Sequence, residues 1–142
     1  MAIKRRRDNL GKVVVRTRDG SVLCGFSSEG HITEDEVTYI SRDGKEQTRS
    51  LEELKAVFFV RDFQGDSDYS EIKFFKKQDH NKWLWVRITF FDEETVEGRV
   101  QNDRELLFSN GFYLWPSDEE TNNELVYIVK SAIKGFVVLG IQ

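Results

Sequence analysis

Apolar and polar residues alternate along most of the chain in short runs, and turn residues separate the runs. Near the amino terminus, Val13, Val15 and Thr17 fall on one face of an extended strand, which indicates a strand with one buried face. Asp-Gly pairs at positions 19–20 and 43–44 predict hairpin turns of type I′, with positive φ at both residues. The pattern predicts strands at residues 13–18, 21–26, 37–41, 45–49 and 56–60.

The second part of the chain shows nearly the same order of elements again. Asp19 and Gly25 correspond to Asp92 and Gly98, because both pairs are 73 residues apart. The two glycines stand in the same strand of each copy, where we expect a bend that a side chain would crowd. The strands predicted in the second copy cover residues 83–91, 95–101, 106–108, 112–115, 125–129 and 136–139.

The five strands predicted in the first copy have the layout of a small five-stranded Sm-like or SH3-like barrel, and the second copy, with one more predicted strand, repeats this layout. Before the last strand of the first copy, Ser50 opens a capping-box pattern that predicts one helical turn. Closing each sheet into a barrel would remove its exposed edges. We therefore expect an all-β fold with two tandem barrels packed together, at residues 12–63 and 83–142. A basic arm at residues 1–11 precedes them, and a segment at residues 64–82 joins them.

The composition describes a folded chain with a slightly acidic balance. Hydrophobic residues make up 39% of the chain and aromatic residues 13%, which is enough for a core. The 21 basic and 25 acidic side chains give a net charge of −4, which argues against general attraction to nucleic acid or anionic lipid. The single cysteine, Cys24, rules out an internal disulfide. No secretion signal and no membrane-spanning run is apparent, so a cytoplasmic location is expected.

Few groups in the sequence suit catalysis. His31 and His80 fall in turn-like or linker contexts, where a surface imidazole is the simpler explanation. Cys24 lies in an alternating strand and is expected to be a buried thiol rather than a nucleophile. Acidic triplets at residues 34–36, 92–94 and 118–120 lack the ligand spacing of a calcium loop. We therefore expect no enzymatic activity, no metal site and no cofactor.

Charged and aromatic residues crowd together after the last strand of the first copy. They are Arg61, Asp62, Phe63, Asp66, Asp68 and Tyr69. Core packing alone does not explain this cluster, so we interpret it as a surface for a protein partner. A fixed clasp between the two barrels is the alternative interpretation. The expected function is that of a binding or adaptor protein, and a second copy of the chain is a further candidate partner.

The basic arm supplies an alternative from another class, which is nucleic-acid binding. Lys4, Arg5, Arg6 and Arg7 could neutralise several phosphates, and outward aromatic side chains could stack on bases. The acidic charge of the whole chain disfavours this alternative, and a solubilising tail also explains the arm.

Two stretches carry a family resemblance. They read KAVFFVRDFQGDSDY from Lys55 and GFYLWPSDEETNNELVYIVKSAIK from Gly111. Both resemble an uncharacterised bacterial domain family whose members occur alone or attached to signalling and repeat modules. The resemblance implies a bacterial cytoplasmic protein with a binding or regulatory role, and it implies no catalytic residues.

Two other resemblances concern the strand pattern. Each copy is similar to Sm-like proteins, but the loops lack the Asp, Met-Asn and Arg-Gly elements that form an RNA pocket in those proteins. The run from Asp19 to Leu23 is similar to the signature of PilZ domains, which bind cyclic di-GMP. Cys24 stands where that signature has glycine, and no Arg-x-x-x-Arg precedes the run. A PilZ-like sensor is therefore a further alternative with an incomplete motif.

Overall fold

The structure is a computed structural model that describes residues 10–63, 83–117 and 122–141. Five strands form the first half: β1 (Gly11–Thr17), β2 (Val22–Ser27), β3 (Glu36–Ser41), β4 (Glu46–Ser50) and β5 (Leu54–Val60). Five more form the second half: β6 (Trp83–Phe90), β7 (Thr95–Gln101), β8 (Gly111–Pro116), β9 (Asn123–Val129) and β10 (Ile133–Ile141). The short helices are η2 (Glu29–His31), η3 (Leu51–Glu53), α1 (Arg104–Phe108) and η4 (Lys130–Ala132).

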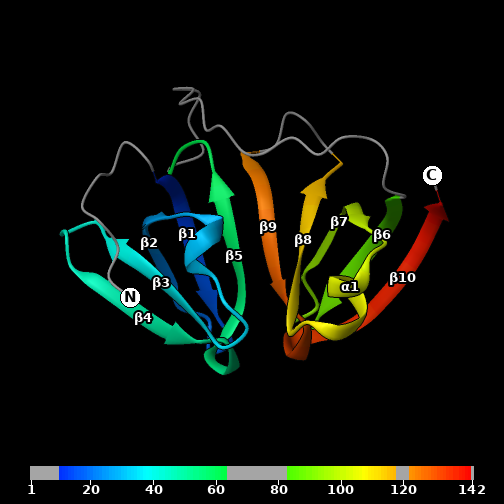
Figure 1. The fold of residues 1–142 in the computed structure, drawn as a ribbon, viewed down its shortest axis with the longest axis horizontal. Coiled ribbons are helices and arrows are strands. Elements are labelled where there is room, and N and C mark those ends of the chain that lie inside the picture. Colours follow the sequence, from blue (N-terminus) through cyan, green and yellow to red (C-terminus); the bar gives the residue numbers. More distant parts are fainter. Residues whose placement is uncertain (1–9, 64–82, 118–121, 142) are drawn as a thin grey trace.

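All ten strands belong to one antiparallel sheet in the order β10-β6-β7-β8-β9-β5-β1-β2-β3-β4. The all-β prediction is therefore confirmed. The expected closure is not observed, because the sheet is open and β4 and β10 lie at its two ends (Figure 1). The halves join through β5 and β9, which pair with Val57 opposite Tyr127 and Phe58 opposite Val126. Every residue of β5 is buried, so this strand needs apolar neighbours on both sides, and the polar β4 could not serve as one.

Two apolar cores lie on opposite faces of β5. Val57 and Phe59 pack into the first core, which also contains residues of β1 and β3 and the β9 residue Tyr127. Phe58 and Val60 pack into the second core, together with residues of β6, β7, β8 and β9. Each core thus contains a strand from the other half. The two halves therefore share an interface, as expected, through the pairing of β5 with β9.

The hairpin turns after β1 and β3, which were predicted as type I′, share one geometry with the turn after β6, and it is not type I′. In the first, the Gly20 amide donates to the Thr17 carbonyl and the Thr17 amide donates to the Ser21 carbonyl. Positive φ occurs at Gly20 (95°) but not at Asp19, so only the last loop residue is left-handed. The corresponding turn after β6 has the same hydrogen bonds but places Glu93 in this conformation, at φ 75°.

Gly25 and Gly98 both lie where a neighbouring strand passes very close. A Cβ on Gly25 would lie 2.3 Å from the Ile40 carbonyl oxygen, and one on Gly98 would lie 2.2 Å from the Trp115 carbonyl oxygen. These are also the positions where β2 begins to pair with β3 and β7 with β8. The predicted crowding at both glycines is confirmed.

Residues 106–108, predicted as a strand, instead belong to the helix α1. The carboxylate of Asp103 accepts a hydrogen bond from the Glu105 amide at 3.1 Å. This N-terminal cap favours a helix over the strand that the apolar run Leu-Leu-Phe suggests. The helical turn predicted after Ser50 is confirmed as η3. The Ser50 hydroxyl accepts from the Glu52 amide at 3.2 Å, one residue earlier than the capping box requires.

The turn geometry predicts that Glu93→Gly stabilises the protein. Glycine adopts positive φ without the steric cost that Glu93 bears, so we expect a gain of ~0.5–1 kcal/mol in the free energy of unfolding. The variant also loses the exposed ion pair of Glu93 with Lys134, which contributes little. Chemical denaturation measures the gain, and Glu93→Gln, which removes only the charge, should not reproduce it.

The close approach at Gly98 predicts a loss of stability for Gly98→Ala. The added methyl group forces β7 and β8 apart, so we expect a loss of ~1–3 kcal/mol by chemical denaturation. Gly30→Ala is the matched control, since its Cβ would meet no atom nearer than 3.9 Å. Equal losses in the two variants would contradict the steric explanation.

Candidate functional site

The free edge of β10 is the most unusual surface of the described structure. Within the described residues, β10 pairs with β6 alone. From Gly135 to Ile141 it carries no charged residue, and its large side chains are exposed. The exposed fractions are 39% for Phe136, 49% for Val137, 47% for Val138, 49% for Leu139 and 75% for Ile141.

Comparison with β5 shows what β10 lacks. The first half has the strand order β5-β1-β2-β3-β4 and the second half has the same order, β10-β6-β7-β8-β9. Phe59 of β5 lies opposite Val13 of β1, and Val138 of β10 lies opposite Val86 of β6. Phe59 is fully buried because β9 covers the other side of its strand, whereas Val138 is half exposed. Within the described residues, β10 is thus an apolar strand with a neighbour on one side only.

The opposite end of the sheet has a different character. β4 reads Glu-Gln-Thr-Arg-Ser and pairs with β3 alone among the described strands. Arg49 forms an ion pair with Glu53 at 3.7 Å, and the Thr48 hydroxyl lies 3.2 Å from that of Thr38. Charged and polar side chains protect an edge strand from pairing with other chains. Of the two end strands that the structure describes, β10 lacks this protection from Gly135 to Ile141.

The residues predicted to bind a partner lie at the junction of the halves where the structure describes them. Arg61 Nε donates to the Glu124 carboxylate at 3.1 Å. The Asp62 amide donates to Asn122 Oδ1 at 3.1 Å, and Asn122 Nδ2 donates back to the Asp62 carbonyl at 2.8 Å. These contacts fasten the end of β5 to the start of β9. They match the alternative interpretation of a clasp, and partner binding here stays a prediction.

The remaining candidates divide between described and undescribed parts of the chain. Phe63 packs edge-on against Phe26, with ring centroids 5.6 Å apart, and lies under the guanidinium of Arg42. Asp66, Asp68 and Tyr69 lie outside the described residues, as do His80 and the arm residues Lys4, Arg5, Arg6 and Arg7.

The side chains that could take part in catalysis or bind a metal have ordinary surroundings in the described structure. The His31 imidazole shares a hydrogen bond of 2.8 Å with the Ser28 hydroxyl. Cys24 is a free thiol that is half-buried rather than fully buried as expected. No cluster of three metal-ligating side chains occurs in the parts of the chain that the structure describes. None of the helices in these parts is long and apolar enough to cross a membrane.

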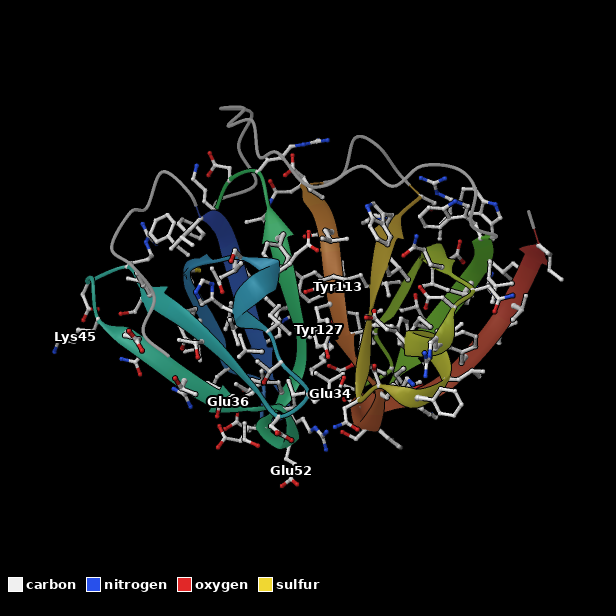
Figure 2. The ribbon with its side chains drawn as sticks, in the orientation of Figure 1. Glu34, Glu36, Lys45, Glu52, Tyr113 and Tyr127 are labelled. Atoms are coloured by element: carbon white, nitrogen blue, oxygen red, sulfur yellow. The ribbon has the colours of Figure 1, made fainter. Side chains whose placement is uncertain are left out.

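A cleft of about 410 Å³ lies between η2 of the first half and α1 and β8 of the second. Its lining includes Tyr113, Trp115 and the carboxylates of Glu29 and Glu105. Burial, and then the negative charge of Glu29, raise the pKa of Tyr113 above its usual value. Tyr127 packs beside it (Figure 2). Burial likewise raises the pKa of Tyr127, to about 12. Both phenols therefore stay neutral at physiological pH, and the described lining contains no histidine, cysteine or serine.

Lys55 is a charged site that the sequence analysis did not single out. Its side chain is only 5% exposed, and its ammonium group binds Asp92 at 2.7 Å and also Glu94, both from the second half. Arg16 reaches Glu94 as well, at 3.3 Å. The only local signal in the sequence is one lysine within an apolar strand. The contact joins the two halves near the start of β5, so its role is structural.

Comparison with known proteins places this chain in an uncharacterised group. Residues 10–140 match the model of a family of unknown function (DUF6982). No curated protein and no solved structure matches the chain.

The Lys55 contact predicts an acid dependence of stability that Asp92→Asn removes. The hydrogen bond from Lys55 lowers the pKa of Asp92 below its ordinary value of 3.8. Because the folded pKa is depressed, the stabilisation is present above pH 3.8 and is lost as the pH falls through the folded pKa. We expect Asp92→Asn to be less stable at neutral pH by under about 1 kcal/mol, since the carboxylate is 54% exposed.

Denaturant unfolding of the unaltered chain and of Asp92→Asn, from neutral pH down to below the folded pKa of Asp92, measures the effect. The difference between them should shrink as the pH falls through the folded pKa of Asp92. A difference that stays constant down to the lowest pH would contradict an ionic origin.

Proposed function

The chain belongs to a family of unknown function, and we propose that it is a non-enzymatic binding protein that takes up a strand of a protein partner at the free edge of β10. The observation that carries the proposal is the exposure of an apolar strand whose counterpart in the first half, β5, is completely buried. Strand addition at a sheet edge is a common mode of peptide recognition, in which main-chain hydrogen bonds supply affinity and alternate side chains supply specificity.

Both faces of β10 favour an apolar partner. Phe136 and Val138 lie on the same face as the core residues Ile88 and Val86 of β6, and the Phe136 ring packs edge-on against Phe112. Val137 lies on the other face, opposite Arg87. A strand added beside β10 would cover apolar side chains on both faces. Full burial of one such side chain contributes about 1.5–3 kcal/mol, so several half-exposed ones provide a substantial driving force.

The chemistry of the partner strand follows from β9, which covers β5. β9 reads Leu-Val-Tyr-Ile-Val at residues 125–129, and all five of these residues are buried. We therefore expect an extended partner segment rich in β-branched and aromatic residues and without charges in its centre. The charged β4 edge does not offer such a surface.

We also propose that the two halves have a common origin, which their shared strand order supports. The two halves are related copies of one small-barrel unit, as the Sm-like and SH3-like patterns suggested, and they have opened into a common sheet. This history explains why a strand of the second half lacks the neighbour that its counterpart in the first half has.

Val137→Glu tests the proposed binding edge. The new carboxylate lies opposite Arg87, so the strand should still fold, but it places a charge where an added strand would bury it. We expect affinity capture from a lysate of the source organism to retain at least about tenfold less partner protein than the unaltered chain does, or ~1.4 kcal/mol in binding.

Val22→Glu is the matched control. Val22 is also an exposed valine opposite an arginine, Arg16, but it lies on β2 away from the sheet ends. This variant should retain the partner, and nuclease treatment should not release it. Retention that is unchanged in Val137→Glu would contradict the β10 site. Release by nuclease would favour the alternative of nucleic-acid binding.

A further inference from the structure

The free edge of β10 also fits one specific partner. We propose that β10 pairs with β10 of a second copy of this chain, antiparallel and about a two-fold axis, so that the two sheets join into one. This inference rests on the proposed function, because it assigns the partner of the strand-addition site. A second copy of the chain could offer one of its own two end strands, β4 or β10, to a free β10.

The first candidate strand is β4, and its sequence excludes it. β4 holds the place in the first half that β9 holds in the second, and each strand leads directly into a short 3₁₀ turn, η3 or η4. β9 has Val126, Tyr127 and Ile128 before this turn. β4 has Gln47, Thr48 and Arg49 at the corresponding distances from η3. Pairing of β10 with β4 would set polar and charged groups against apolar side chains, which costs free energy.

The exclusion of β4 limits how copies of the chain can assemble. Pairing of β10 with β4 of the next copy would be a head-to-tail contact, which forms rings or open filaments. The polar β4 prevents that series from starting. Pairing of β10 with itself uses the same surface twice and closes at two copies.

The β10 strand suits pairing with itself. Opposite residues of an antiparallel pair project on the same side of the sheet, so apolar side chains meet apolar side chains on both faces. No charge lies between Gly135 and Ile141, so the two copies do not repel each other there. An axis at Val138 gives the longest overlap of this uncharged segment and sets Val137 opposite Leu139 of the second copy.

The size of the contact sets the expected strength. Stable specific interfaces bury at least about 1,200 Å² in total, and one strand from each copy is small by that measure. We therefore expect a dimer that dissociates on dilution, with a dissociation constant of order micromolar.

Light scattering coupled to gel filtration, repeated over a wide range of protein concentration, tests the dimer. The mass of the unaltered chain should rise from 16.6 kDa towards twice that value as the concentration increases. Val137→Glu should raise the dissociation constant at least tenfold, because it buries one carboxylate from each copy near the axis. Val22→Glu, with the same change on β2, should behave as the unaltered chain.

Cysteine cross-linking locates the axis and does not depend on the folding of the charged variant. In a Cys24→Ser background, single cysteines replace Phe136, Val137, Val138 and Leu139 in turn. A cysteine on the two-fold axis lies opposite the same cysteine of the second chain, at a Cα separation of about 4.5–5.5 Å, which a disulfide spans. We expect oxidation to link the two chains of Val138→Cys most rapidly. The rate of linkage should be lower for cysteines at Phe136, Val137 and Leu139.

The outcomes separate this inference from the proposed function. A chain that stays monomeric at every concentration, but loses a captured protein on Val137→Glu, overturns the self-pairing and leaves the strand-addition site in place. A dimer that survives Val137→Glu and gives no linkage maximum along β10 forms through another surface, which also overturns the inference. A monomer whose capture of other proteins is unchanged by Val137→Glu contradicts both.

Discussion

The pairing of β5 with β9 is the interaction on which the rest of the structure depends. Through it, the first half supplies one wall of the second core, and the second half supplies one wall of the first. Neither core is complete without the other half, and each half alone is close to the smallest size that sustains a core. The polar contacts across the junction lie near the ends of the same strand. Lys55, near the start of β5, binds Asp92 and Glu94, and Arg61, just beyond its end, binds Glu124. Burial fixes the pairing, the contact of Arg61 with Glu124 joins the end of β5 directly to β9, and Lys55 joins the start of β5 to the turn between β6 and β7.

An open sheet must have two edges, and this chain treats them differently. At β4 the residues are polar, and an unwanted strand gains little by pairing there. At β10 an apolar strand remains without a second neighbour among the described residues. The difference follows from the role of each strand within its half. β9 is apolar because it must cover β5, whereas β4, in the same place of the first half, covers nothing and can be polar. β10 has kept the apolar character of β5 without the strand that buries β5.

Much of the fold could be predicted from the pattern of residues, because strand positions depend on local alternation and turn chemistry. The two close approaches at Gly25 and Gly98 were also predictable, since each glycine interrupts a strand at the same place in its copy. The open sheet was not predictable from these signals. β5 pairs with β1 of its own half on one side, and the identity of its neighbour on the other side depends on residues about 70 positions away, about which local periodicity carries no information. The helix α1 was missed because the cap at Asp103 outweighs the apolar run after it.

The candidate site was harder to predict for a related reason. A crowded set of charged and aromatic residues, Arg61 to Phe63 among them, suggested a binding surface. The Arg61 side chain and the Asp62 backbone join the end of β5 to the start of β9, whereas Phe63 packs within the first half, and partner binding here stays a prediction. β10 is apolar like β5, but every residue of β5 is buried whereas the large apolar side chains of β10 are exposed. Composition reports the surroundings that a strand requires, and only the topology reports whether the chain itself supplies them. For β5 the chain supplies them through β9. For β10 the described residues supply only one side, which is why we propose that another molecule supplies the second, and the uncharged sequence of the strand restricts which molecules can do so.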